Sequence, residues 1–277
     1  IFAAAQQNHP DLLVLLADMG ANVNAKAHNG STAAYIAAVQ NHPGVIKILA
    51  ERGANVAAPK SNNWTPAFIA TKRGFDEVAW QIEASLNRNE ELLRAAATGD
   101  EAEVERLLRA GVYIDQSSED FMAGSTPTSI AAAGGHLRVV KMLAESDADL
   151  DGGDYPPLWM AALRGHMNIV HYLVSRGADL NIKTGDGRTP VFVAAQEGQY
   201  AMLKELAHQG ADLNIVDDSS ITPTFMAAQK GNTKMVKCLV SLGADINLPD
   251  AEGTTPLMVA SQNRHLETVR LMISTGK

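Results

Sequence analysis

The chain has 277 residues, of which 46% are hydrophobic and 19% are charged, and its formal net charge is −8. This hydrophobic fraction is high enough to bury a core, so the composition excludes a disordered tail. The negative charge, without a concentrated basic stripe, argues against nucleic acid as the main ligand. No apolar run approaches the about 20 residues that span a bilayer, so we expect no membrane insertion.

The single cysteine, Cys238, excludes an intrachain disulfide framework and is typical of a reducing compartment. We therefore expect a cytoplasmic protein. The first ten residues lack the basic and apolar regions of a signal peptide. The chain begins with Ile1 instead of methionine, which indicates a segment of a longer polypeptide.

Three sequence landmarks recur with one constant period. Glycines with this spacing are Gly20 and Gly53, and then Gly177, Gly210, Gly243 and Gly276. A Thr-Pro step recurs in phase with them, and its prolines at 190, 223 and 256 share the same spacing. An Ala-Ala pair and a second glycine follow, as in AAQEG at 194–198. Three landmarks in one register predict stacked repeats.

Each landmark has a local physical reason. Threonine can cap the free N–H groups of a helix, and proline at the first helical position loses no hydrogen bond. Paired alanines such as Ala194 and Ala195 allow neighbouring helices to approach closely, and Gly198 ends the first helix. Apolar residues then recur at helical spacing over 169–174. Gly177 ends this second helix, and the segment ADLN is expected to project as a hairpin-like finger.

These motifs resemble the ankyrin repeat, and the resemblance covers essentially the whole chain. It implies a mainly α fold, an ankyrin-repeat α-solenoid of stacked helix-turn-helix units with β-hairpin-like fingers. We count nine repeats, of which the first begins inside its first helix and the last stops at Gly276. A single repeat cannot bury its apolar face alone, so the core must form between neighbours.

The period is broken between Gly53 and Gly111, which are separated by less than two full repeats. The third repeat ends in QIEASLNRN without a finger, and the fourth begins directly with EELLRAAATGD. We predict two stacks, residues 1–86 (repeats 1–3) and residues 89–277 (repeats 4–9), joined at helix ends. A continuous solenoid with one missing finger is the alternative. Two further fingers differ in length, since 116–125 is three residues longer than the standard and 151–156 is three shorter.

No catalytic or cofactor site is predicted, so we expect a protein that is not an enzyme. The DADLDG segment at 147–152 matches the start of a calcium loop, but Leu158 stands where the glutamate ligand is needed. Five histidines occupy inter-helix turns, where a structural role is expected: His9, His42, His136, His166 and His265. Cys238 has no base at a recognisable spacing, and its default role is that of a small buried hydrophobe.

In five repeats an aromatic residue lies two positions after the proline slot: Tyr35, Phe68, Trp159, Phe192 and Phe225. The family usually has histidine there. Stacking between first helices is the preferred interpretation, and partly exposed anchor groups are the alternative. Both interpretations place this row on the first helices, beside the fingers.

The resemblance implies that finger tips and first helices form a concave groove that binds partner proteins. Because interface energy concentrates in Trp, Tyr and Arg, we favour Trp64 with Arg73, and Tyr155 with Arg164. An alternative for Trp64 is that it folds down onto Phe68 or a neighbouring finger. The residues expected to contact the partner are Trp64, Lys72, Arg73, Phe121, Met122, Tyr155, Arg164, Arg188, Ile221 and Lys230.

The leading functional hypothesis is a non-catalytic interaction scaffold or adaptor. The alternatives are a structural subunit held inside a large complex and the regulatory region of a larger enzyme or channel. Neither end of the chain has a polar capping repeat, so we expect flanking chain or a partner to cover both ends. In particular, Leu271 and Met272 are expected to expose an apolar face otherwise.

Overall fold

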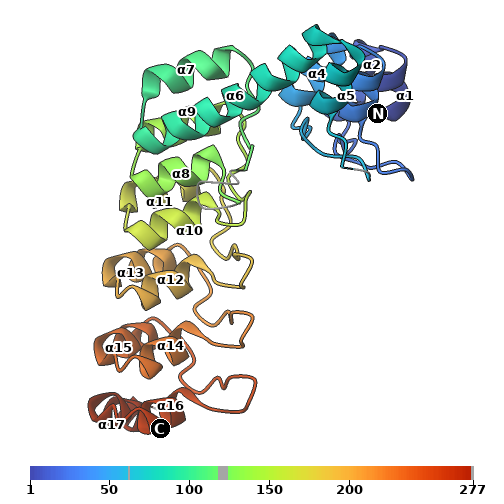
Figure 1. Ribbon diagram of the computed structural model, residues 1–277. Helices are drawn as coiled ribbons and strands as arrows, with labels where there is room; N and C mark the ends of the chain where they lie inside the picture. The colour runs from blue at the N-terminus through green and yellow to red at the C-terminus, as the bar shows by residue number, and fades with distance from the viewer. Residues whose placement is uncertain (62, 118–123, 276–277) are drawn as a thin grey trace. The chain divides into compact units, whose positions relative to one another are not determined.

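The computed structural model describes residues 1–61, 63–117 and 124–275. In these ranges the secondary structure is helical, with no β-strand (Figure 1). The chain divides into two compact units, one of residues 1–96 and 100–116 and the other of residues 97–99 and 117–277. Each unit is described by itself below.

The helices follow one another in antiparallel pairs joined by short turns. In the first unit they are α1 (Phe2–Gln6), α2 (Pro10–Asp18), α3 (Ala33–Val39), α4 (Pro43–Glu51), α5 (Pro66–Arg73), α6 (Asp76–Thr98, whose last residues belong to the second unit) and α7 (Glu101–Arg109). In the second they are α8 (Pro127–Gly134), α9 (Leu137–Glu145), α10 (Pro157–Arg164), α11 (Met167–Ser175), α12 (Pro190–Gln196), α13 (Tyr200–His208), α14 (Pro223–Gln229), α15 (Thr233–Ser241), α16 (Pro256–Gln262) and α17 (Leu266–Thr275).

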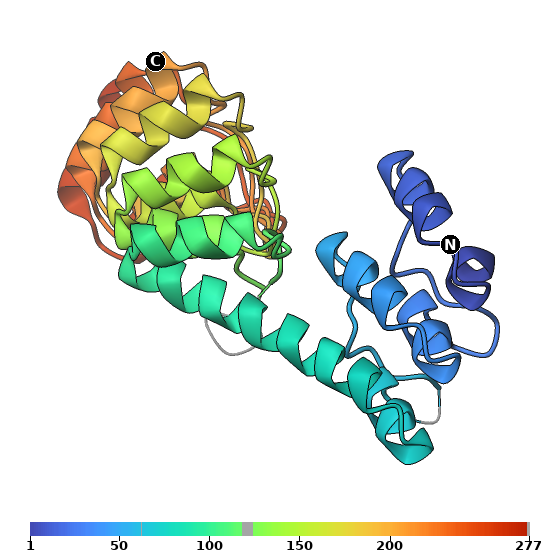
Figure 2. The same ribbon diagram turned by 90° about the horizontal axis from the view of Figure 1, so that it is seen from above.

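The second unit is a regular stack. Its first helices α8, α10, α12, α14 and α16 contact one another in that order, and the second helices form a parallel layer (Figures 1 and 2). The described loops between successive pairs project to the same side (Figure 1). The core lies between the layers and contains the alanine pairs, such as Ala194 and Ala195, which are at most 2% exposed. This arrangement bears out the predicted helical solenoid.

Helix starts follow the Thr-Pro rule. The Oγ1 atom of Thr189 accepts a hydrogen bond from the backbone N–H of Phe192 at 3.2 Å, and Thr32, Thr65, Thr126, Thr222 and Thr255 cap their helices in the same way. The described first helices α1 and α10 lack this cap, because Ile1 and Pro156 occupy their capping positions and make no side-chain bond. Local sequence therefore determines where nearly every first helix begins.

Four of the five inter-helix histidines have the structural role that their position predicts. The Nε2 atoms of His42, His136, His166 and His265 lie 2.9–3.2 Å from carbonyl oxygens at or near the end of the preceding repeat's first helix. Gln199 makes the equivalent bond, since its Nε2 donates to the carbonyl of Leu163 at 2.7 Å. These side chains satisfy carbonyl groups that a helix end leaves without an intrahelical partner.

The prediction of β-hairpin-like fingers is wrong for the part of the chain that is described. The fingers of standard length are turns closed by two backbone bonds. In the finger before α12, the N–H of Thr184 donates to the carbonyl of Arg188 at 3.0 Å, and the N–H of Gly187 donates to the carbonyl of Thr184 at 2.9 Å. Neighbouring fingers are joined mainly through side chains: the Oδ1 atom of Asn181 accepts from the N–H of Asp212, and that of Asn214 from the N–H of Asp245. These isolated bonds replace the ladder that a β-hairpin requires.

One link in this series has an aspartate where most fingers have asparagine. The Oδ1 atom of Asp151 accepts from the N–H of Asp179 at 3.0 Å. Partial burial raises the pKa of the Asp151 carboxyl, and the nearby charges of Asp179 and Asp149 raise it further, although the bond from Asp179 opposes them. The folded state therefore favours the protonated form of Asp151 more than the unfolded state does, so ionisation of this carboxyl reduces stability.

We expect Asp151→Asn to raise the free energy of unfolding by about 0.5 kcal/mol at pH 7, a value already reduced for solvent screening. Asparagine keeps the acceptor oxygen and removes the repulsion. The gain should shrink as the pH falls through the raised pKa of Asp151, because the wild-type carboxyl then becomes neutral. Urea unfolding at several pH values measures this difference, and a gain independent of pH would contradict the electrostatic cause.

The predicted boundary at 86–89 falls inside α6, which is one continuous helix. Beyond α7, the segment around Gly111 and Tyr113 lies against the end of α4, since a Cβ atom on Gly53 would be 2.6 Å from Cζ of Tyr113. Within the first unit, the segment after α7 thus lies beside the Gly53 finger. The division into stacks at 1–86 and 89–277 stays a prediction.

The expectation that Leu271 and Met272 expose an apolar face is wrong. Met272 is 3% exposed and Leu271 is partly buried. On α17 the exposed apolar side chains are Leu266 and Ile273, at 68% and 56%. The error arises because a helix that is packed on one side exposes only the residues on its opposite side.

Candidate partner-binding surface

The finger before α5 carries an aromatic and cationic cluster. The Trp64 ring lies 5.4 Å from the Phe68 ring, at an interplanar angle of 57°. The Nζ atom of Lys72 lies 4.2 Å from the centre of the Trp64 ring and 5.9 Å from that of Phe68. Steps of four residues put Phe68 and Lys72 on one face of α5, directly after the capping residue Thr65.

The cluster is open to solvent. Phe68 is 48% exposed, Lys72 is exposed, and Trp64 is half-buried. The indole has folded down against Phe68, as the alternative interpretation of Trp64 expected. The two interpretations are therefore compatible, because the pair as a whole still presents apolar surface and a positive charge.

Two neighbouring residues extend this cluster across the first unit. The Nζ atom of Lys60 lies 5.5 Å from the centre of the Tyr35 ring on α3. Arg73 donates from Nη1 to the carbonyl of Val39 at 2.8 Å and is exposed. We call the residues Lys60, Trp64, Phe68, Lys72 and Arg73 the aromatic–basic surface.

The second predicted pair is not joined by direct contact. The Tyr155 ring lies 5.6 Å from that of Trp159, while Arg164 is exposed at the other end of α10. Trp159 is 8% exposed, and its Nε1 atom has no hydrogen-bond partner in the described part of the chain. The structure thus links Tyr155 to the aromatic row and leaves Arg164 separate.

The remaining predicted residues have different surroundings. The Nε atom of Arg188 lies 3.2 Å from Asp186 and 3.9 Å from Asp217, and its guanidinium lies 5.5 Å from the Phe192 ring. Ile221 is partly buried and donates from its N–H to Asp217, while Lys230 donates to the carbonyl of Gln196 at 3.2 Å. Phe121 and Met122 lie outside the described residues.

The aromatic row is mainly structural. Tyr35, Trp159, Phe192 and Phe225 are at most 8% exposed, as the stacking interpretation predicts. Phe68 differs, at 48%, and it belongs to the aromatic–basic surface. Of the aromatic row, only Phe68, beside the Trp64 finger, therefore contributes to a candidate site.

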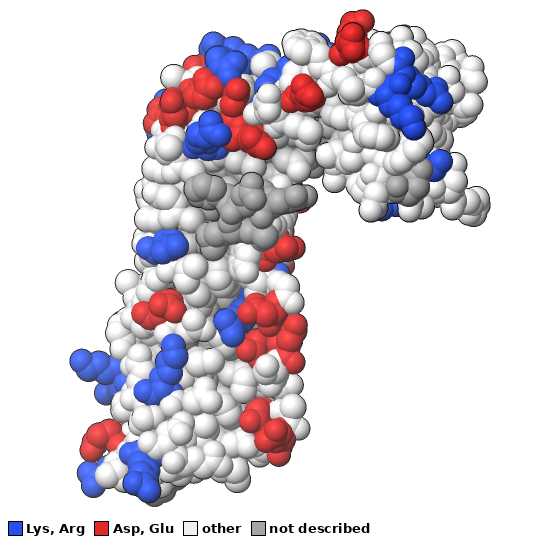
Figure 3. All heavy atoms as spheres, in the orientation of Figure 1, with Lys and Arg blue, Asp and Glu red and all other residues white. Residues whose placement is uncertain are grey.

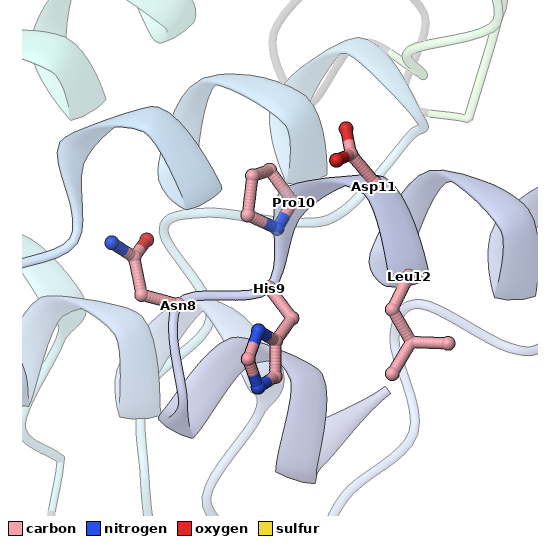
Figure 4. A pocket seen from close by; sticks show the side chains of 5 residues that line it. All are labelled: Asn8, His9, Pro10, Asp11 and Leu12. Carbon is pink, nitrogen blue, oxygen red and sulfur yellow. The ribbon is translucent and has the colours of Figure 1, made fainter.

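The described residues offer little for other chemistry. They contain no group of three or more His, Cys, Asp or Glu side chains that could hold a metal ion. Cys238 is buried in α15. A hollow at the start of α2 is lined by residues 8–12, but the side chains of Asn8, Asp11 and Leu12 point in different directions (Figure 4). This hollow has no converging set of polar groups.

The fingers of the second unit have the opposite charge. Acidic side chains gather along their edge (Figure 3). Asp186 and Asp218 are exposed on these fingers. Arg188 is bound within this group. The positive charge of Arg188, which lies over the Phe192 ring, is thus neutralised by neighbouring carboxylates.

Sequence reasoning missed two features of the first unit, the half-buried Lys60 and the exposed Trp80. Lys60 was not selected, although it lies four residues before Trp64 in the same finger. Trp80 is 65% exposed on α6, in the second-helix position that holds Lys47 in the preceding repeat. Alignment of the second helices would have found Trp80, whereas the contact of Lys60 with Tyr35 depends on tertiary structure.

The fold and this surface define a protein of stacked helix pairs connected by fingers. A family model for ankyrin repeats (three copies) matches residues 1–90, 92–184, 151–217 and 191–277. The chain therefore belongs to the ankyrin-repeat family. No curated protein matches the chain significantly. Among the described helices, none combines the length and apolar character needed to cross a membrane.

Proposed function

We propose that the protein is a non-catalytic scaffold or adaptor that binds a partner protein through its fingers and first helices. Ankyrin repeats are generally protein–protein interaction modules and typically do not catalyse reactions. The observation that carries the proposal is the exposed contact of Trp64, Phe68 and Lys72. A half-exposed aromatic pair capped by a cation has the composition of an interface hot spot.

The proposal places the binding energy on the aromatic–basic surface. Trp64 and Phe68 offer apolar area that a partner can remove from water. The surface lies on a finger and a helix whose backbone is held by the Thr65 cap and the turn bond from Lys60 N–H to the Trp64 carbonyl. A site held in this way loses little conformational entropy on binding.

We expect Trp64→Ala to weaken partner binding by about 2 kcal/mol, which is about thirtyfold in Kd. The partner is first captured from lysate on the wild-type protein and identified by mass spectrometry. It is then purified, and its Kd is measured by titration calorimetry. Trp80→Ala is the matched control, because it removes an equally large exposed indole from a second helix of the same unit.

The control variant should bind like the wild type, and both variants should keep the wild-type melting temperature within a few degrees. An unchanged Kd for Trp64→Ala with unchanged melting would remove Trp64 from the interface. Loss of binding by Trp80→Ala alone would move the interface to the second helices.

A further inference from the structure

The two finger and first-helix segments that lead to α4 and α6 are free of acidic residues. Residues 22–40 and 55–75 contain Lys26, Lys60, Lys72 and Arg73 but no Asp or Glu. The corresponding segment 149–165 of the second unit contains three aspartates and one arginine. The two units therefore present surfaces of opposite sign on equivalent elements.

Several cations elsewhere in the first unit are neutralised. Arg52 pairs with Asp18, Lys47 lies 3.8 Å from Glu51, and Arg106 lies 2.9 Å from Glu91. These pairs involve the second helices or, for Glu91, the later part of α6. The four cations of the fingers and first helices make no ion pair with any described residue.

Aromatic rings position two of these cations without neutralising them. Lys72 lies over Trp64 and Lys60 over Tyr35, at 4.2 and 5.5 Å. A ring attracts a cation through its quadrupole but carries no net charge, so the positive potential remains available to a ligand. Arg188 shows the contrast, because it lies over Phe192 and also beside two carboxylates.

We propose that the aromatic–basic surface binds an acidic peptide segment of the partner, with carboxylates at Lys60, Lys72 and Arg73 and an apolar side chain on Phe68. This inference rests on the proposed function and adds the chemistry of the partner. The inference rests on charge complementarity. The cations of the aromatic–basic surface make no ion pair within the described part of the chain although the net charge is −8, so this surface attracts an anion locally.

A peptide fits better than a nucleic acid. Base recognition on single strands requires open aromatic faces on which bases stack. Lys72 covers the Trp64 ring, and Phe68 lies against it at a tilted angle, so the indole has limited room for a base. The net charge of −8 also disfavours a long phosphate backbone as the ligand.

The test selects short random peptides from a display library on the whole chain. We expect the wild type to enrich peptides rich in Asp and Glu, and we expect Lys60→Glu/Lys72→Glu/Arg73→Glu to lose that enrichment. Lys47→Glu is the control for a single charge reversal, because it makes one such reversal on a second helix of the same unit. Circular dichroism of all variants confirms that they are folded.

A selected peptide is then synthesised for Kd measurements. We expect the triple variant to bind it at least about tenfold more weakly than the wild type, and Lys47→Glu to bind it equally well. Raising the salt concentration from about 0.05 M to about 0.5 M should also weaken binding to the wild type, because exposed charges are screened.

Three results would overturn the inference. Selected peptides without excess acid that still require Trp64 would leave the proposed function intact and refute the acidic partner. A random single-stranded oligonucleotide that binds more tightly and displaces the peptide would assign the surface to nucleic acid. Acidic peptides that bind equally to the triple variant would place their site elsewhere. If none of the selected peptides depended on Trp64 for binding, the proposed function would be refuted as well.

Discussion

Ala195→Leu is expected to lower the free energy of unfolding by about 3 kcal/mol, because three extra carbon atoms enter a well-packed core. Ala195 is 2% exposed on α12, which contacts both α10 and α14. Equivalent alanine pairs recur through the stack and are equally buried. A leucine at this position must push the first helices apart or adopt a strained rotamer.

Urea unfolding followed by circular dichroism measures this change. Ala201→Leu is the control, since it makes the same substitution at an exposed position on α13, and we expect its effect to stay within about 0.5 kcal/mol. Wild-type stability in Ala195→Leu would show that the repeat register assigned to α12 is wrong.

The second large effect is expected at the tip of the finger before α12. Gly187 has a φ of +80°, and a Cβ atom there would lie 2.7 Å from the backbone nitrogen of Asp218 in the next finger. That nitrogen donates to the carbonyl of Asp186 at 3.1 Å. Gly187→Ala should cost about 3 kcal/mol, since left-handed strain of about 1 kcal/mol adds to displacement of a neighbouring backbone.

Gly177→Ala separates the two contributions. Gly177 has a φ of +90°, but a Cβ atom there would meet nothing within 4 Å. We therefore expect only the strain, about 1 kcal/mol. Equal losses for Gly177→Ala and Gly187→Ala in urea unfolding would mean that contact between fingers contributes little.

The finger conformation was the clearest failure of sequence reasoning. The resemblance to ankyrin repeats implied a hairpin at each ADLN-type segment. In the fold, Asn181 and Asn214 instead use their side chains to bind the next finger's backbone. The partner of each bond lies in the following repeat, so the local pattern does not distinguish such a link from a strand ladder.

The candidate site was predictable in part. The spacing of Trp64, Phe68 and Lys72 places them on one turn-and-helix face, and this follows from local geometry alone. The contact of Lys60 with Tyr35 joins a finger to the first helix of the preceding repeat. Such a contact depends on how two repeats stack, which no local pattern specifies.

The sequence by itself determined the period, the helix starts and the glycine turns, because capping and left-handed backbone depend on neighbouring residues. Tertiary structure decided which side chains are exposed and which charges are paired. Lys72 and Arg188 both accompany an aromatic residue, yet only Arg188 has Asp217 beside it, from the next finger along the chain. Electrostatic pairing depends on distance in space, so only the stacked repeats determine where a positive charge remains for a partner.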